Sequence, residues 1–133
     1  MSKYAYPAVF TQEEGGYSIT FPDFEACFTQ GDSVDDGLSM AEDVLCLTLY
    51  DMEEKGETIP VPSDPRDIKT DSESFVTLVR CDTLEYRKFF DNRAVKKTLT
   101  VPHWLDEMAT RANVNFSQTL QNALMEQLGV KRH

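Results

Sequence analysis

The sequence predicts an α+β protein built from two modules: a small sheet crossed by one helix, then a strand followed by two short helices. Side chains alternate between apolar and polar over 4–10 and 17–21, which is typical of strands. Apolar residues recur every three or four positions over 34–52, which is typical of a helix, and the charge changes sign near residue 93. The 133 residues suffice for one ordinary domain or two small ones.

The chain opens with a predicted hairpin and a short third strand. Pro7 lies inside the first strand and predicts an edge strand or a bulge, because proline has no N–H for the ladder. Two glycines end the turn over 13–16, where they supply positive φ at no steric cost. Residues 17–21 form the second strand, and a third is expected over 26–29.

The helix of the first module begins at Ser33. Ser33 and Asp36 occupy the N-cap and N3 positions of a capping-box-like start, and Gly56 is expected to end the helix. Its apolar stripe consists of Val34, Leu38, Ala41, Leu45, Leu49 and Met52.

A proline-rich connection over 58–69 leads to a fourth strand over 75–79. Residues 84–90 are expected to form a helical turn, and its aromatic side chains Tyr86, Phe89 and Phe90 should pack against other groups. The first module is therefore βββαβ. We expect it to cover 1–82, with a linker over 83–93 and the second module over 94–133.

The second module has one strand and two helices. The strand over 95–101 stops at Pro102, which is expected at position N1 of the first helix. Asn115 and Gln118 begin the second helix, and Gly129 ends it. The apolar faces of these helices contain Leu105, Met108, Ala109 and Ala112, then Phe116, Leu120, Ala123, Leu124 and Leu128.

The two modules carry opposite charges. Residues 93–133 hold six basic and three acidic side chains, a net charge of +3. The whole chain is −10, so residues 1–92 carry −13. Phosphates repel such an acidic module, which suits a basic partner, whereas the basic module suits a polyanion.

The sequence predicts no cofactor and no metal site. Cys27, Cys46 and Cys81 lie far apart, with no CxxC spacing and no histidine beside them, so we expect reduced thiols in a cytoplasmic protein. Neither a signal peptide nor a membrane span is expected, because the apolar runs are too short.

A strand with one polar face and two short helices cannot close a core alone, but two copies can. This stretch, over about 94–130, resembles the ribbon-helix-helix family of DNA-binding proteins, whose two-stranded ribbon enters the major groove. The resemblance implies binding to operator DNA by a homodimer joined through an antiparallel β-ribbon, or by a tetramer. Leu99 and Val101 would then point into the shared core. A pure dimerisation module is the alternative.

The resemblance also implies DNA-binding residues. The positions that match the base-reading side chains of the family are Lys96, Thr98 and Thr100. Lysine suits guanine O6 and N7, and threonine can contact a thymine methyl group. The amides of Phe116 and Ser117 match the family's phosphate-binding helix start. Lys97 departs from the pattern, since it falls where the family usually has an inward apolar residue.

A second resemblance covers roughly residues 4–80. The series from Gly15 to Phe24, then Thr29 to Ser33, an amphipathic helix and finally 59–63 is similar to the HicB family of antitoxins. The resemblance implies a degenerate ribonuclease-H-like sheet that binds HicA, a small basic toxin that cleaves mRNA, and masks its active-site surface. It also implies that the antitoxin represses its own operon.

The candidate toxin-binding residues are Asp23, Glu25, Asp32 and Asp35. Each could instead be a solvated surface carboxylate or a cap, and Asp36 is better explained as the cap partner of Ser33.

Two other functions stay open at this point. One is a stand-alone ribbon-helix-helix repressor whose acidic domain senses a small ligand. The other is a nuclease of the ribonuclease-H kind, which needs clustered carboxylates to hold two metal ions. Asp23, Asp32, Asp35 and Asp36 fall in turns and at a helix start, so we expect no enzyme.

Overall fold

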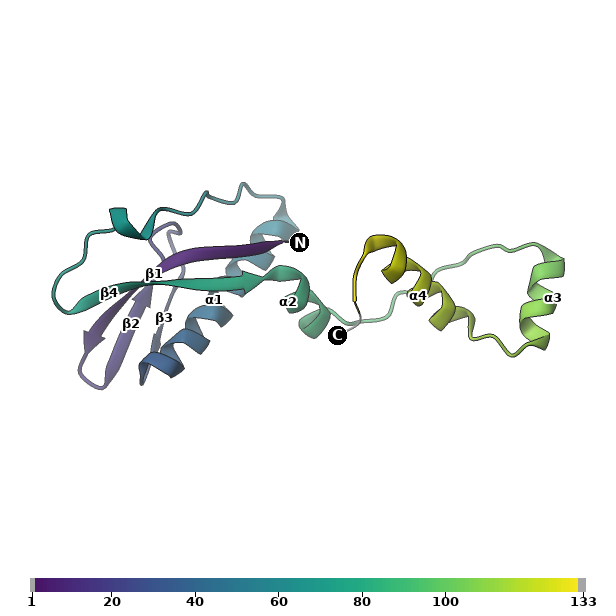
Figure 1. Ribbon diagram of the computed structural model, residues 1–133, viewed down its shortest axis with the longest axis horizontal. Coiled ribbons are helices and arrows are strands. Elements are labelled where there is room, and N and C mark those ends of the chain that lie inside the picture. Colours follow the sequence, from purple (N-terminus) through teal and green to yellow (C-terminus); the bar gives the residue numbers. More distant parts are fainter. Residues whose placement is uncertain (1, 132–133) are drawn as a thin grey trace. The chain divides into compact units, whose positions relative to one another are not determined.

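The computed structural model describes residues 2–131, which belong to two compact units, unit 1 (1–92) and unit 2 (93–133). Unit 1 is a four-stranded antiparallel sheet in the order β3-β2-β1-β4 with one long helix across a face (Figure 1). Its elements are β1 (Lys3–Glu13), β2 (Gly16–Thr20), β3 (Phe28–Gly31), α1 (Val34–Lys55), the 3-10 turn η1 (Pro65–Asp67), β4 (Ser74–Asp82) and α2 (Thr83–Phe90). The predicted α+β class and the βββαβ order are confirmed.

β1 is a central strand and pairs with β4 through Pro7 without a bulge, so the prediction of an edge strand or a bulge is wrong for the strand as a whole. Pro7 pairs with Leu78 of β4, whereas the ladder with β2 begins only at Val9. The stretch around Pro7 therefore has a neighbouring strand on one side only. A residue without an N–H is tolerated there, because only one side of β1 requires ladder hydrogen bonds at that point.

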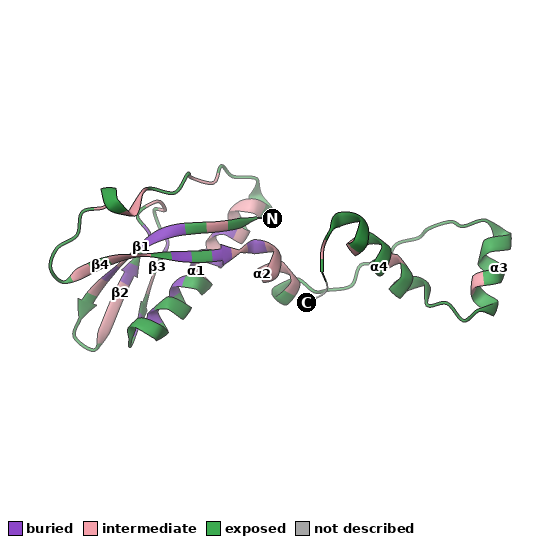
Figure 2. Ribbon diagram, in the orientation of Figure 1, coloured by how far each residue is buried: buried purple, intermediate pink, exposed green. Residues whose placement is uncertain are grey.

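The core of unit 1 lies between α1 and the sheet face that it covers (Figure 2). Tyr6, Ala8 and Phe10 alternate along β1 toward this core, as the period of two predicts. The other core residues come from β2, the β2–β3 loop, α1 and β4, and they are Ile19, Phe21, Cys27, Ala41, Leu45, Cys46, Leu49, Val79 and Cys81.

The first turns of α1 differ from the predicted apolar stripe. Val34 and Leu38 are exposed, and Gly37 is buried instead. A Cβ atom on Gly37 would lie 2.9 Å from the ring of Phe10, and one on Gly31 would lie 2.5 Å from the Cα atom of Gly37. The helix backbone therefore comes so close to the sheet here that only glycine fits, and larger residues lie to the side.

The predicted helix ends are confirmed. Ser33 Oγ accepts a hydrogen bond from the Asp36 amide at 3.1 Å, and the Asp36 carboxylate accepts one from the Asp32 amide at 2.8 Å. The second bond reaches the residue before the N-cap rather than the N-cap itself. Gly56 ends α1 in the left-handed region with φ 68°.

α2 follows β4 directly and is capped by Asp82. Tyr86 packs against the core and lies 5.3 Å from the ring of Tyr50. The ring of Phe90 lies 4.5 Å from that of Tyr86 and 4.8 Å from that of Phe89, although Phe89 and Phe90 stay 68% and 66% exposed. The expectation that the three aromatic side chains pack is therefore confirmed for Tyr86 against the core, whereas Phe89 and Phe90 pack only within this aromatic group.

Unit 2 contains α3 (His103–Arg111) and α4 (Phe116–Leu128). Asn115 caps α4 by accepting from the Gln118 amide at 3.0 Å, and Gly129 ends it, both as predicted. Pro102 is the N-cap of α3 rather than N1, because its extended backbone places its carbonyl to accept from Leu105 and Asp106.

No described residue of unit 2 is buried (Figure 2). Residues 91–102 form neither helix nor ladder, and the described chain offers the predicted strand over 95–101 no partner strand. The strand therefore stays a prediction that concerns a second copy. Among the described residues, no helix is long and apolar enough to span a membrane.

Candidate interaction surfaces

Asp23 holds the proline-rich connection against the β2–β3 loop. Its carboxylate accepts hydrogen bonds from the Ser63 amide at 3.1 Å and from the Ser63 hydroxyl at 2.5 Å. The hydroxyl of Tyr6 donates to the carbonyl of Pro60 in the same connection. Asp23 therefore has a structural role, whatever else it binds.

Asp23 and Glu25 line one open groove of about 790 Å³, which we call the acidic groove. Its walls come from the β2–β3 loop, the second half of α1 and the chain that follows α1. The residues that line it are Asp23, Phe24, Glu25, Ala26, Cys27, Leu47, Thr48, Tyr50, Asp51, Met52, Glu57, Thr58 and Pro60. Apolar side chains and four carboxylates thus share this surface.

The other two predicted carboxylates lie elsewhere. Asp32 lines a smaller hollow of about 230 Å³ between the β1–β2 turn and the end of β3, together with Glu13 and Glu14. Asp35 is exposed in the first turn of α1 and lines neither hollow. The structure therefore brings Asp23 and Glu25 together and leaves Asp32 and Asp35 apart from them.

Sequence reasoning missed the groove residues of α1 and of the chain after it. Leu47 is 54% exposed, and Asp51 lies one turn further along the same helix. Leu47 is an apolar residue outside the predicted stripe, and this misfit was the one signal available in the sequence. Glu57 lies just past the helix end, and no local pattern marks it.

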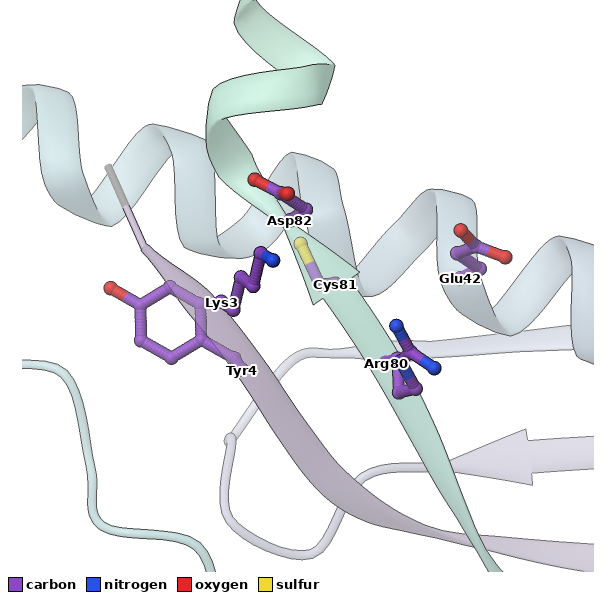
Figure 3. Close-up of a pocket in the computed structure, with 6 residues that line it drawn as sticks. All are labelled: Lys3, Tyr4, Glu42, Arg80, Cys81 and Asp82. Carbon is purple, nitrogen blue, oxygen red and sulfur yellow. The ribbon is translucent and has the colours of Figure 1, made fainter. Parts of the chain in front are cut away.

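A third hollow, of about 430 Å³, lies where β1 begins and β4 ends (Figure 3). Lys3 and Arg80 line it beside Glu42 and Asp82, so its charges are mixed. The hydrogen bond with Cys46 and burial both raise the pKa of the Cys81 thiol in this hollow.

The described part of the chain contains no cluster of ligand side chains that catalysis by metal ions would require. No three His, Cys, Asp or Glu side chains gather there in a way that could hold a metal ion. Asp23, Asp32 and Asp35 in particular line different hollows or none.

A buried carboxylate joins β1, α1 and α2. Glu53 accepts hydrogen bonds from Tyr4 at 2.8 Å, Thr83 at 3.0 Å and Arg87 at 3.0 Å. Burial alone would raise the pKa of Glu53, but hydrogen bonds, these three among them, outweigh it and lower that pKa to about 2. Arg87 also pairs with Glu54 and lies over the ring of Tyr50 at 4.6 Å. This network fixes α2 to the body of unit 1.

The predicted DNA-binding residues of unit 2 are all exposed. Lys96, Thr98 and Thr100 lie in the extended segment before α3. Phe116 and Ser117 form the first turn of α4, where backbone N–H groups lack intrahelical acceptors. A hollow of about 550 Å³ runs between this segment and α4, and it is lined by Lys97, Leu99, Val101, Asp106, Phe116, Ser117, Thr119, Leu120 and Ala123.

Comparison with known proteins gives a consistent family. Residues 3–78 match the model of a family described as the HicB-like antitoxin of bacterial toxin–antitoxin systems. Antitoxin HicB 1 of Photorhabdus laumondii is 44% identical over 50 residues, which cover 38% of this chain and 32% of that protein. Matches to the curated HicB antitoxins span only between 32% and 47% of the length of those relatives.

Solved structures of similar proteins cover more of the chain. A chain of a toxin–antitoxin complex from Streptococcus pneumoniae is 31% identical with a TM-score of 0.60, covering 94% of this chain and 99% of that one. A chain of the HicA3 and HicB3 toxin–antitoxin complex is 25% identical with a TM-score of 0.51, covering 59% of this chain and 99% of that one.

Proposed function

Because this chain belongs to the HicB-like antitoxin family, we propose that it binds and neutralises a small basic HicA-type toxin that cleaves mRNA, and that it represses its own operon by binding DNA. The family match over 3–78 carries the proposal. The proposal includes a cytoplasmic location and no catalytic activity of the chain itself.

The charge of unit 1 supports the toxin partner. At −13, residues 1–92 attract a basic protein, and opposite fields speed association and favour the right partner over others. The relatives described above include chains from two toxin–antitoxin complexes. Asp23, Glu25, Asp32 and Asp35 are the proposed toxin-binding carboxylates.

The exposed apolar side chains of unit 2 support the proposed homodimer. Its apolar side chains lie exposed in the single chain, and a unit of this size rarely closes a core without a partner. The exposed ones include Val95, Leu99, Val101, Trp104, Leu105, Met108, Phe116, Leu124 and Leu128. A second copy would bury them by pairing the segments over 95–101 into an antiparallel ribbon, and two dimers would form a tetramer.

The same ribbon would present the DNA-binding surface. Lys96, Thr98 and Thr100 would contact base edges in the major groove, and the amides of Phe116 and Ser117 would bind a phosphate. The net charge of +3 in residues 93–133 suits a phosphate backbone.

Co-expression with the protein encoded beside this chain tests the proposal. We expect the neighbour to arrest growth alone, to be harmless with this chain, and to co-purify with it. A neighbour that is harmless alone and forms no complex would contradict the toxin partner. Such a result would favour the other candidate, a repressor whose acidic domain senses a small ligand.

A further inference from the structure

We propose that the acidic groove is the docking site for the toxin, and that its occupant is a toxin segment with an apolar side chain flanked by Lys or Arg. The inference rests on the proposed function, and it goes further by choosing one surface of unit 1 and the chemistry of what covers it.

The groove gathers several apolar side chains that a partner could cover. Leu47 is 54% exposed on α1, in a groove that Phe24, Met52 and Pro60 also line. Covering these side chains removes apolar surface from water, which contributes favourably to association. A wholly polar peptide would leave this contribution unused, so the occupant needs an apolar side chain.

The charges that line the groove determine which charge the docking segment should carry. Asp23 and Glu25 come from the β2–β3 loop, Asp51 from α1, and Glu57 from the chain after it. No Lys or Arg is among the residues found to line the groove. Asp51 does pair with Lys55 at 2.9 Å, but both side chains are exposed and such pairs are worth little. The groove therefore favours cations.

The walls of the groove are held at a fixed spacing. Cys27 at the end of the β2–β3 loop is buried against α1, and its sulfur lies 3.5 Å from the Thr48 hydroxyl oxygen, so the loop packs directly on the helix. Ser63 ties the proline-rich connection to Asp23 of that loop. The rings of Tyr6 and Phe24 pack edge to face at 4.8 Å. A preformed site of this kind binds with little ordering cost.

The other two hollows of unit 1 suit a basic, partly apolar occupant less well. The hollow at Asp32 is smaller and has Tyr17 as its one large apolar side chain among the described lining residues. The hollow of Figure 3 presents Lys3 and Arg80, which repel a cationic segment. The acidic groove alone combines exposed apolar surface with carboxylates and no opposing cation in its described lining.

Two matched pairs of variants in the full chain test the site. Leu47→Lys places a cation in the groove, and Leu78→Lys is its control, since Leu78 is 53% exposed on β4 and lies outside the groove. Glu25→Lys is paired with Glu73→Lys in the same way, because Glu73 is exposed, lies outside the groove and is not among the proposed toxin-binding carboxylates. The probe is a catalytically inactive variant of the toxin encoded beside this chain, and the Kd is measured by calorimetry.

We expect Leu47→Lys and Glu25→Lys to weaken binding by roughly thirtyfold or more, as loss of an interface hot spot does. The two control variants should stay within about threefold of the unmodified chain, as near-neutral positions do. If the unmodified chain binds and all four variants bind equally well, the groove is the wrong surface while the proposed function stands. If the unmodified chain does not bind, the proposed function and the inference both fail.

Hydrogen exchange provides a test that needs no variant. In the complex, the amides of 23–27 and 47–52 should exchange more slowly than in the free chain. Protection confined to other parts of unit 1 would overturn the inference even if a variant failed to fold.

Discussion

The contact between Gly31 and Gly37 offers a sharp test of how α1 sits on the sheet. A Cβ atom on Gly31 would lie 2.5 Å from the Gly37 Cα atom, 2.6 Å from its amide nitrogen and 3.2 Å from the Asp36 carbonyl carbon. All three atoms belong to the backbone of α1, so no side-chain rotation can relieve the contact. The variant Gly31→Ala must push the helix away from β3.

The expected magnitude follows from two opposing contributions. Overpacking of a tight contact costs about 1–3 kcal/mol, and a backbone contact belongs near the upper end, at about 3 kcal/mol. Replacing glycine by alanine lowers the conformational entropy of the unfolded chain, which stabilises the folded protein by about 0.4–1 kcal/mol. We therefore expect Gly31→Ala to lower the free energy of unfolding of unit 1 by about 2 kcal/mol.

Urea unfolding can measure this in the full chain. All five tyrosines lie in unit 1 and the single tryptophan, Trp104, lies in unit 2, so near-ultraviolet dichroism of tyrosine and fluorescence of tryptophan report the units separately. Ser39→Ala is the control, because Ser39 is exposed on α1 and the change leaves the contact between Gly31 and Gly37 untouched. Such a surface substitution should stay within about 0.5 kcal/mol of the original. A Gly31→Ala protein within about 0.5 kcal/mol of the original would refute the close approach of helix and strand.

Three further predictions concern the network, the connection and the ribbon. The pKa of Glu53 falls from 4.5 to about 2 on folding, so its stabilising effect is complete above pH 4.5 and is lost as pH falls toward 2. We expect the free energy of unfolding of unit 1 to fall by up to about 3 kcal/mol as the pH drops through that window. The variant Glu53→Gln should flatten this part of the curve of stability against pH, as measured by tyrosine dichroism. Ser63→Ala removes one hydrogen bond to Asp23 and should therefore speed proteolysis within 58–69, which timed digestion and mass spectrometry can follow. An unchanged cleavage pattern would show that other contacts hold the connection in place. Replacing Lys96, Thr98 and Thr100 together by alanine should abolish the preference for operator DNA in mobility-shift assays, while sedimentation still shows a dimer. Unchanged operator binding would show that other residues read the bases.

Local sequence patterns were enough for the elements of unit 1 and for the ends of α1 and α4, but not for the strand ends, since β1 and β4 are longer than predicted and β3 is shifted by two residues. The alternation along β1 and β2, the cap at Ser33 and the glycine at position 56 are all short-range features, and the structure has each of them. Such features depend on neighbours within four residues, so a single sequence displays them directly.

Features that depend on distant residues were harder to predict. The position of Pro7 in a central strand depends on where β2 ends, and the burial of Gly37 depends on Gly31 across a loop. The acidic groove combines residues near positions 25, 50 and 58. No periodicity links these stretches, and only an apolar residue outside its stripe, Leu47, pointed toward the groove.

Under the proposed function, the two units differ in what they need in order to fold, and this difference bears on their activities. Unit 1 closes its own core around Tyr6, Phe10 and Leu45, whereas no described residue of unit 2 is buried. A unit that completes its core only as a dimer is stabilised by mass action, so its folded fraction falls as the chain is diluted. Under the proposed function, DNA binding should therefore be lost at concentrations where toxin binding persists. Dilution of one preparation, followed by operator binding and by toxin binding, measures both. Parallel loss of the two activities would mean that unit 1 also depends on the second copy.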